Sequence, residues 1–488
     1  MAVSTQIGEL MYTKDKFQKF ERRLEKFFHS NLYILFMAAL TLLGWKLNTQ
    51  YALAVMILTT SVMFLTCRDI TPFLALHWFY FISFRDGQYG LDFAGWKIIL
   101  PILLVLSLIV NIVRFKPDFK GALSPKSIKR TTLSMFLLII PMSLGGIMLA
   151  DRHVFVVVEV VVLFVCLALA FAYYMAIGRK NIVDKTAPLR YVIKMMLAVG
   201  ILCSLQIIIS VLEAGSADAM QAMLTNKRIY LGWGGANHVG ALLGLCIPAS
   251  FYYMIKSKKF GFVFVILTFV EFCILVVTQS RGAIMFTAAA LPFLFAYVIA
   301  TSPNKRSIAI TAATLIATAV TLMVIFRGTL TEVVNKLLDK GFDDSGRFRL
   351  YKEAVELFKN NPIFGGGWDY KAKRDELSFT PLAFHSMLLQ VLACSGIIGL
   401  IFYTYYYWAR YSTFFKVKTP ESRIVLAGML ILEGYGMIDP ISFFPITYFI
   451  VLMTMSLAAE QALPDNLGHP LPFIKRRDMR LRGKKSTQ

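Results

Sequence analysis

The stretch TPLAFHSMLLQVLACSGIIGL, residues 380–400, places one ionisable residue, His385, at the start of a long apolar run. An α-helix needs about 20 apolar residues to cross a membrane. Because a bilayer core offers no water to peptide groups, such runs fold as helices that pair their own backbone. The whole chain of 488 residues is 57% hydrophobic and only 16% charged. We therefore predict an all-α polytopic membrane protein.

Apolar runs recur along the rest of the chain and predict about 12 to 14 transmembrane helices. The runs fall near residues 31–48, 50–67, 72–84, 97–113, 131–150, 154–177, 190–212, 237–255, 260–279, 283–300, 307–326, 384–409, 422–437 and 441–459. The predicted parts are a cytoplasmic amphipathic segment (1–30), transmembrane helices 1 to 11 (31–326), a large extracytoplasmic catalytic loop (327–383), C-terminal transmembrane helices (384–460) and a basic cytoplasmic tail (461–488).

Positive charge predicts the orientation of the chain, because cytoplasmic loops of membrane proteins carry an excess of Lys and Arg. Placing the N-terminus in the cytoplasm puts most of the 51 Lys and Arg residues on that side. We therefore predict that both termini are cytoplasmic. The net charge of +22 then serves mainly to orient the chain and to hold anionic lipids, and we expect no nucleic-acid partner.

The N-terminal segment has apolar side chains at helical spacing among basic residues. These side chains are Phe17, Phe20, Leu24, Phe27 and Phe28. The pattern fits a short amphipathic helix on a membrane surface, and a frayed charged tail is the alternative.

The predicted topology brings the features that look chemical to the outer face. These features are GWGGANH (232–238), TQSRG (278–282), the loop 327–383 and His385. Arg281 in TQSRG either reaches toward lipid headgroups or clamps a phosphate, to which a guanidinium can donate two hydrogen bonds. Asn237 and His238 open the eighth predicted span and are candidates to line the same cavity.

The long outer loop contains a predicted amphipathic helix from Arg347 to Asn360. Ser345 is its expected N-cap, and Asn361-Pro362 is expected to end it. Its apolar stripe comprises Tyr351, Ala354, Val355 and Phe358. Arg347 and Arg349 stand at the helix N-terminus, where free amides and the helix dipole favour an anion. The alternative is a solvated, basic first turn.

Aromatic residues and a histidine follow this helix. Trp368 and Tyr370 come after Gly365-Gly366-Gly367, so exposed rings could offer flat faces to sugars, or the segment could be an ordinary glycine-rich turn. His385 could accept a proton from a hydroxyl near neutral pH. The alternative for His385 is a capped residue at the membrane interface.

Several acids lie in or beside predicted spans, where they are costly and often functional. Glu159 and Glu271 fall inside spans, and Glu433 and Asp439 flank a turn; each could instead pair with a neighbour. No cluster has metal-ligand spacing, Asp343-Asp344 is only a weak signal for a divalent ion, and the six cysteines show no CxxC pairing. We predict no metal and no cofactor.

The segments TQSRG, GRFRLYKEAVELFKNNPIFGGGWDY and FHSMLLQVLACSGIIGL occur in an order that resembles the O-antigen ligase/polymerase superfamily, over about residues 230–410. The resemblance implies a bacterial membrane glycosyltransferase with a GT-C-like architecture. It implies transfer of a glycan from undecaprenyl diphosphate to an acceptor hydroxyl at the outer face of the cytoplasmic membrane. The anomeric centre would be inverted, with no nucleotide sugar or metal.

By the same resemblance, Arg281 and Arg347 match the arginines of the family and His385 matches its histidine. Ser386 stands where the family commonly has Asn, which puts the orientation of the imidazole in question. In this mechanism the arginines balance the diphosphate charge and His385 takes the proton of the hydroxyl.

We expect a polymerase of O-antigen, capsule, exopolysaccharide or wall polymer, and a ligase to a distinct acceptor is the alternative. The partners would be the undecaprenyl-diphosphate-linked oligosaccharide, the glycan acceptor and membrane lipids, with a flippase and a chain-length regulator as candidates. A transporter or flippase of lipid-linked glycan would instead show internal repeats and helices broken at mid-membrane. A signalling or scaffold protein would leave the outer arginines unexplained.

Overall fold

The computed structural model shows a helical chain. The described residues are 18–85, 98–122, 128–148, 165, 167–170, 172–178, 184–216, 218–220, 229–325, 347–368, 384–439 and 446–464. Within these ranges, the only β-pairing is an isolated bridge between Tyr230 and Gly235. The predicted all-α fold is therefore confirmed.

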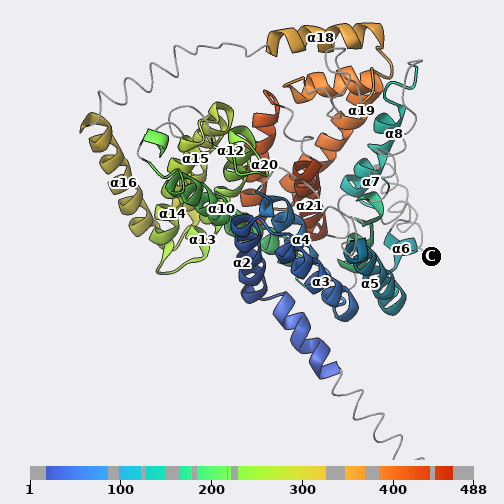
Figure 1. The fold of residues 1–488 in the computed structure, drawn as a ribbon, viewed down its shortest axis with the longest axis horizontal. Coiled ribbons are helices and arrows are strands. Elements are labelled where there is room, and N and C mark those ends of the chain that lie inside the picture. The colour runs from blue at the N-terminus through green and yellow to red at the C-terminus, as the bar shows by residue number, and fades with distance from the viewer. Residues whose placement is uncertain are drawn as a thin grey trace, which may run out of the picture. The chain divides into compact units, whose positions relative to one another are not determined.

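Several helices are long and apolar enough to cross a membrane (Figure 1). Four such helices occur in the described part of the chain: α10 (Ala187–Leu212), the pair α12 and α13 (Ala236–Cys246 and Pro248–Lys256), α15 (Arg281–Thr301) and α19 (Met387–Lys416). They confirm a multi-pass membrane protein.

The remaining predicted runs, apart from 154–177, also coincide with helices. These helices are α2 (Asn31–Leu47), α3 (Tyr51–Thr66), α4 (Phe73–Tyr80), α5 (Ile99–Phe115), α7 (Arg130–Leu137), α8 (Ile139–Leu144), α14 (Gly261–Val277), α16 (Lys305–Ile325), α20 (Pro420–Gly436) and α21 (Ile446–Ala462). Most of the run 154–177 lies outside the described residues. The number of crossings stays a prediction.

Two of the predicted spans carry two helix labels but run on as single apolar helices, Arg130–Leu144 and Ala236–Lys256. The run 131–150 divides into α7 and α8, and the run 237–255 divides into α12 and α13. Pro248 is the first residue of α13. Because proline has no amide hydrogen, it is tolerated at a helix start and disrupts a helix interior. Pro248 therefore marks the division between α12 and α13, and Ile247, with helical φ −47° and ψ −42°, joins them.

The N-terminal segment forms a helix, Gln18–Phe28, which meets α2 at a bend of 63°. Arg22, Arg23 and Lys26 are exposed on this helix, whereas Phe28 is buried. Phe20 is exposed as well, so these residues form a helix whose place on a membrane surface stays a prediction. Phe17 lies outside the described part of the chain.

Contacts between residues divide the chain into two compact units, which are described separately. Unit 1 comprises Met1–Lys116, Leu189–Gly346 and Arg423–Val451. Unit 2 comprises Pro117–Pro188, Arg347–Ser422 and Leu452–Gln488.

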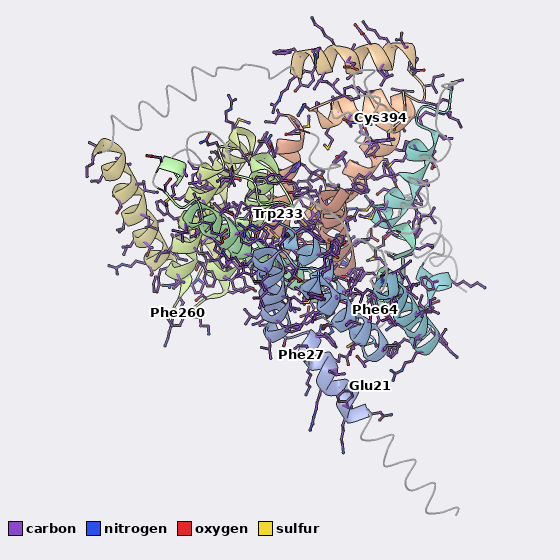
Figure 2. The ribbon with its side chains drawn as sticks, in the orientation of Figure 1. Glu21, Phe27, Phe64, Trp233, Phe260 and Cys394 are labelled. Atoms are coloured by element: carbon purple, nitrogen blue, oxygen red, sulfur yellow. The ribbon has the colours of Figure 1, made fainter. Side chains whose placement is uncertain are left out.

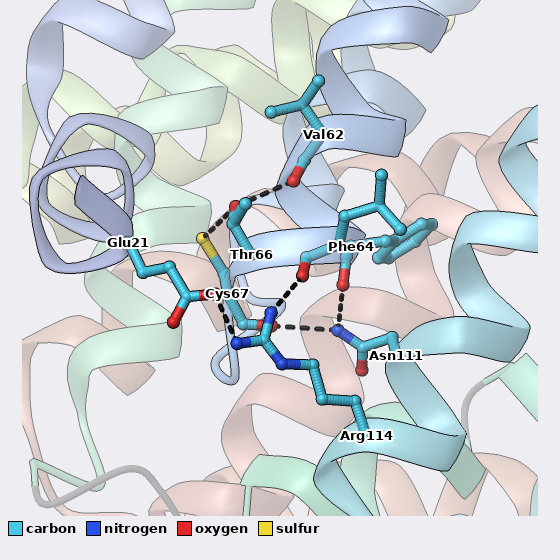
Figure 3. A network of polar contacts seen from close by, with 8 residues as sticks. Glu21, Val62, Phe64, Thr66, Cys67, Asn111 and Arg114 are labelled. Carbon is cyan, nitrogen blue, oxygen red and sulfur yellow. Dashed lines mark hydrogen bonds and ion pairs between the residues drawn. The ribbon is translucent and has the colours of Figure 1, made fainter. Parts of the chain in front are cut away.

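Polar contacts of unit 1 join the ends of three helices that the topology predicts to face the cytoplasm (Figure 3). Arg114, at the end of α5, pairs with Glu21 of the N-terminal helix and donates to the backbone oxygen of Leu65 at 2.6 Å. The Asn111 amide donates to the backbone oxygen of Cys67 at 2.9 Å. The N-terminal helix, the end of α3 and the end of α5 thus lie on one side of unit 1.

A corresponding network joins three helix ends of unit 2. The backbone N–H and hydroxyl of Thr132, near the start of α7, donate to the carboxylate of Glu460 at 2.9 and 2.6 Å. The Lys129 ammonium donates to the backbone oxygen of Glu460 at 3.1 Å. The hydroxyls of Thr131 and Thr413 are 2.7 Å apart. The start of α7 and the ends of α19 and α21 therefore lie together, and the side of the membrane they face stays a prediction.

Helix α19 is interrupted at Gly396, which has φ 60° and ψ −155°. The segment that follows α18 (Arg347–Asn360) fills this break (Figure 1). The N–H groups of Gly366 and Gly367 donate to Ala393 and Cys394 at 2.7 and 2.9 Å, and Ile397 N–H donates to Pro362 at 2.9 Å. Backbone groups freed by the break are thus paired, as a membrane helix requires.

We predict that Gly396→Ala destabilises the protein by about 2 kcal/mol or more. A Cβ at this position would lie 2.4 Å from the Ile363 oxygen, in a backbone conformation that non-glycine residues rarely adopt. Gly215→Ala is the matched control, because Gly215 also has positive φ but its Cβ would have open space around it. Thermal unfolding of the two purified variants measures the difference. Equal losses would show that contact with the 362–367 segment does not matter.

Candidate active site

The residues predicted to form the site belong to two units. Arg347, Arg349, Trp368 and His385 lie in unit 2. Arg281, Asn237 and His238 lie in unit 1. Tyr370, Asp343, Asp344, Ser345 and Glu159 lie outside the described residues.

His385 has an unusual backbone conformation. Its φ is 49°, in the left-handed region. Three other described non-glycine residues have positive φ, and these three, Asn48, Lys116 and Gln279, directly follow the last turn of a helix, where this conformation is common. His385 instead precedes a helix, because α19 begins at Met387 after its N-cap, Ser386. Strain of this kind persists only where neighbouring contacts hold the backbone, and it is frequent at functional sites.

Hydrogen bonds from two helices hold the backbone around His385. The N–H of Phe384 donates to the side-chain oxygen of Gln390 at 2.9 Å, and Phe384 itself is fully buried. The hydroxyl of Tyr351, in α18, donates to the backbone oxygen of His385 at 3.1 Å. His385 as a whole is half-buried, and the Nδ1 atom of its imidazole is inaccessible to solvent. The backbone is thus constrained on both sides.

The α18 helix has the predicted bounds and begins at Arg347. Arg347 precedes Tyr351 by four residues, so the two share one helix face about 6 Å apart along the axis. Arg349 precedes Tyr351 by two residues and points to the opposite face, where it is exposed. Helical periodicity therefore puts Arg347, rather than Arg349, on the face of α18 that carries Tyr351.

The buried stripe of α18 differs by one residue from the predicted one. Ala354 and Leu357 are buried, whereas Val355 is 38% exposed. The prediction for Val355 is therefore wrong, because Leu357 occupies the position that packs against Gly366.

The expected exposure of Trp368 is also wrong. Its side chain is 5% exposed, and its indole N–H donates to the hydroxyl of Ser395 at 2.6 Å. The ring packs near Tyr403, with 6.0 Å between ring centroids. The glycines before Trp368 approach the backbone of α19 rather than a ligand. Trp368 therefore anchors this turn inside unit 2 and offers no open face to a sugar.

In unit 1, Arg281 is the first residue of α15 and is exposed. The turn before it, Thr278–Ser280, is buried at its two hydroxyl residues, and Ser280 N–H donates to the Thr278 hydroxyl at 3.2 Å. The side chain of Ser280 does not cap α15. The first amides of α15 and the guanidinium of Arg281 therefore add positive potential at one place.

A chain of hydrogen bonds connects this turn with Asn237. Ser280 donates to the Tyr435 hydroxyl and Tyr435 donates to the Asp439 carboxylate, both at 3.4 Å. The Asn237 amide donates to the same carboxylate oxygen at 3.2 Å. The hydroxyl of Tyr448 donates to the backbone oxygen of His238 at 2.6 Å. These hydrogen bonds connect the TQSRG and ANH segments within unit 1.

The loop before α12 is fixed by two buried tryptophans of unit 1. Trp233, labelled in Figure 2, donates to the side-chain oxygen of Gln206 at 2.9 Å. Trp45 donates to the backbone oxygen of Leu231 at 2.8 Å. Both rings are essentially inaccessible. These contacts hold the start of α12, and with it Asn237 and His238.

Sequence reasoning missed the supporting residues Tyr351, Gln390 and Tyr435. Tyr351 was assigned only to an apolar stripe, and no sequence pattern marked Gln390 or Tyr435. Their importance follows from contacts over 34, 6 and 155 residues of chain. In the described ranges no group of three or more His, Cys, Asp or Glu residues could hold a metal ion.

Comparisons with known proteins add one finding. Residues 262–404 match a family model described as O-antigen ligase. No curated protein and no solved structure matches the chain. The matched segment includes Arg281, Arg347 and His385, whereas Asn237 and His238 precede it. The match supports a membrane enzyme of the ligase/polymerase type and the resemblance of residues 262–404 to the O-antigen ligase/polymerase superfamily.

Proposed function

We propose that this protein transfers a glycan from an undecaprenyl-diphosphate-linked donor to an acceptor hydroxyl at the outer face of the bacterial cytoplasmic membrane. The observation that carries the proposal is the constrained histidine, His385, bonded to the helix that Arg347 opens, inside a segment that matches the O-antigen ligase family. The identity of the donor, the identity of the acceptor and the membrane face at which they react are parts of this proposal.

In the proposed reaction, the acceptor oxygen attacks the anomeric carbon of the donor sugar. The bond between this carbon and the phosphate oxygen breaks, and undecaprenyl diphosphate leaves with inversion of the anomeric centre. His385 accepts the proton of the attacking hydroxyl. A neutral imidazole suits this role because its ordinary pKa lies near neutral pH.

Arg281 and Arg347 would balance the charge of the departing diphosphate. Each is the first residue of a helix, so its guanidinium and the free amides of the first turn attract the same anion. The proposal requires both arginines to face one diphosphate. The hydrogen bonds from Asn237 and Tyr435 to Asp439 would keep the turn before Arg281 in place.

Transport of lipid-linked glycan is the alternative from another class, and it predicts broken helices. Helix α19 is indeed broken at Gly396. The break, however, is filled by backbone from residues 362–367 of the same unit. A transporter would instead use the freed peptide groups for its substrate. The structure of unit 2 therefore favours the enzyme.

We predict that His385→Ala and Arg281→Ala each lower glycan transfer by about a hundredfold or more, because they remove the proton acceptor and a charge partner of the leaving group. The measurement is transfer by purified protein in vesicles supplied with lipid-linked oligosaccharide. Arg423→Ala is the control, since Arg423 is an exposed arginine of unit 1 that stacks on Tyr297. Near-normal transfer by His385→Ala in a folded protein would remove the proposed base.

We also predict that Arg347→Ala impairs transfer by about a hundredfold, whereas Arg349→Ala loses less than about fivefold. Both substitutions remove one positive charge from the first turn of α18, so their difference reports which helix face meets the substrate. Lys352→Ala, another exposed cation of this helix, controls for net charge. Equal losses at positions 347 and 349 would show that only the total charge matters.

Between the two branches of the family we propose a polymerase. A polymerase extends the glycan on its lipid carrier, so the product from a single oligosaccharide donor is a ladder of lengths without any other acceptor. A ligase gives product only when a distinct acceptor is added. Electrophoresis of lipid-released glycan after incubation with donor alone distinguishes them. Absence of the ladder, together with transfer to an added acceptor, would establish a ligase and leave the roles of His385 and Arg281 unchanged.

A further inference from the structure

Glu271 is a buried acid inside the apolar helix α14 of unit 1. Its side chain is 1% exposed. Neither carboxyl oxygen has a hydrogen-bond partner among the described residues. Thr268, one turn earlier on the same helix, uses its hydroxyl on the backbone oxygen of Phe264 at 2.8 Å. The carboxyl therefore differs from the Thr268 hydroxyl, which makes a hydrogen bond within its own helix.

Space for this carboxyl is provided by a neighbouring helix. A Cβ on Gly200, in α10, would lie 2.8 Å from one oxygen of Glu271 and 3.1 Å from the Cβ of Cys246 in α12. Any larger residue at position 200 would thus collide with the acid. Glu271 fills a gap formed by α10, α12 and α14 together, so its burial results from the packing of three helices.

The surroundings of the carboxyl contain no positive charge in the described part of the chain. Its titratable neighbours are the thiols of Cys203 on α10 and Cys246 on α12. No lysine, arginine or histidine pairs with it among the described residues. A bound metal cation such as sodium would need several oxygen ligands. The neighbouring thiols of Cys203 and Cys246 do not supply such oxygen ligands.

We propose that Glu271 is a proton-binding site within unit 1 and holds its proton in the folded protein. An ionised carboxylate in this setting would lack both solvent and a counter-charge, at a large cost in free energy. The neutral acid packs against Gly200 and Cys246 and so keeps α10, α12 and α14 together. Loss of the proton would require these helices to separate and admit water or a cation.

The position of Glu271 connects its protonation with the two helices that carry residues of the candidate site. Glu271 lies seven residues before Thr278, or about 10 Å along α14 from the turn that carries Arg281. Cys246 lies nine residues after Asn237, or about 13 Å along α12. The carboxyl thus lies about two helical turns from the end of α14 that precedes Arg281 and from the start of α12 that carries Asn237. The protonation of Glu271 itself is independent of the proposed glycan transfer.

Infrared spectroscopy of the full-length protein in lipid vesicles tests the proposal. Near neutral pH, the wild-type protein is expected to show the carbonyl stretch of a protonated carboxyl, and Glu271→Gln is expected to lose it. Glu460→Gln is the matched control, because Glu460 is equally buried but its carboxylate accepts two hydrogen bonds from Thr132. Loss of the band in Glu460→Gln rather than in Glu271→Gln would overturn the proposal.

A measurement on the wild-type protein covers the case in which Glu271→Gln fails to fold. Dicyclohexylcarbodiimide, an apolar reagent for protonated carboxyls, is expected to modify Glu271, as detected by peptide mass mapping. A wild-type spectrum without any protonated-carboxyl band near neutral pH overturns the proposal with no variant required. Glycan transfer plays no part in either readout, so failure of this proposal and failure of the proposed enzyme are distinguishable.

Discussion

A broken membrane helix must find partners for the peptide groups that the break releases, and this constraint organises unit 2. In α19 the break at Gly396 frees carbonyl groups at Ala393 and Cys394 and an N–H group at Ile397. The segment 362–367 pairs with them through its own backbone. Because this segment follows α18 directly, satisfying the break also seats α18 against the first part of α19. The candidate site of this unit is thus a consequence of backbone pairing.

The strain at His385 becomes understandable from the same arrangement. A non-glycine residue in the left-handed region costs about 1 kcal/mol or more, so surrounding contacts must compensate. The side-chain oxygen of Gln390 accepts a hydrogen bond from the N–H of Phe384, and the hydroxyl of Tyr351 donates one to the backbone oxygen of His385. Tyr351 can make this hydrogen bond because the backbone pairing of residues 362–367 fixes α18 against α19. The orientation of the imidazole therefore depends on residues distant from it in sequence.

The regular elements could be predicted from sequence because they depend on local patterns. The bounds of α18 follow from apolar periodicity and from the stop at Asn361-Pro362, and the apolar runs coincide with helices. Trp368 could not be predicted, because its burial depends on Ser395 and Tyr403. The conformation of His385 likewise depends on contacts that no local pattern encodes. The predicted topology placed the TQSRG and ANH segments at the same face. The hydrogen bonds that connect them through Tyr435 and Asp439 could not be predicted.

Arg281 and Arg347 are each the first residue of a helix, a position suited to the proposed role of binding a diphosphate leaving group. A diphosphate must be held while its charge develops and released when the product leaves. Burying an arginine in a rigid ion pair would serve the first need and oppose the second, since a buried charge is costly to leave unpaired. Arg281 is exposed, Arg347 is half-buried, and each opens a helix whose amides supply further positive potential. In the proposed reaction, exposed donors of this kind would let water replace the diphosphate when the lipid carrier departs.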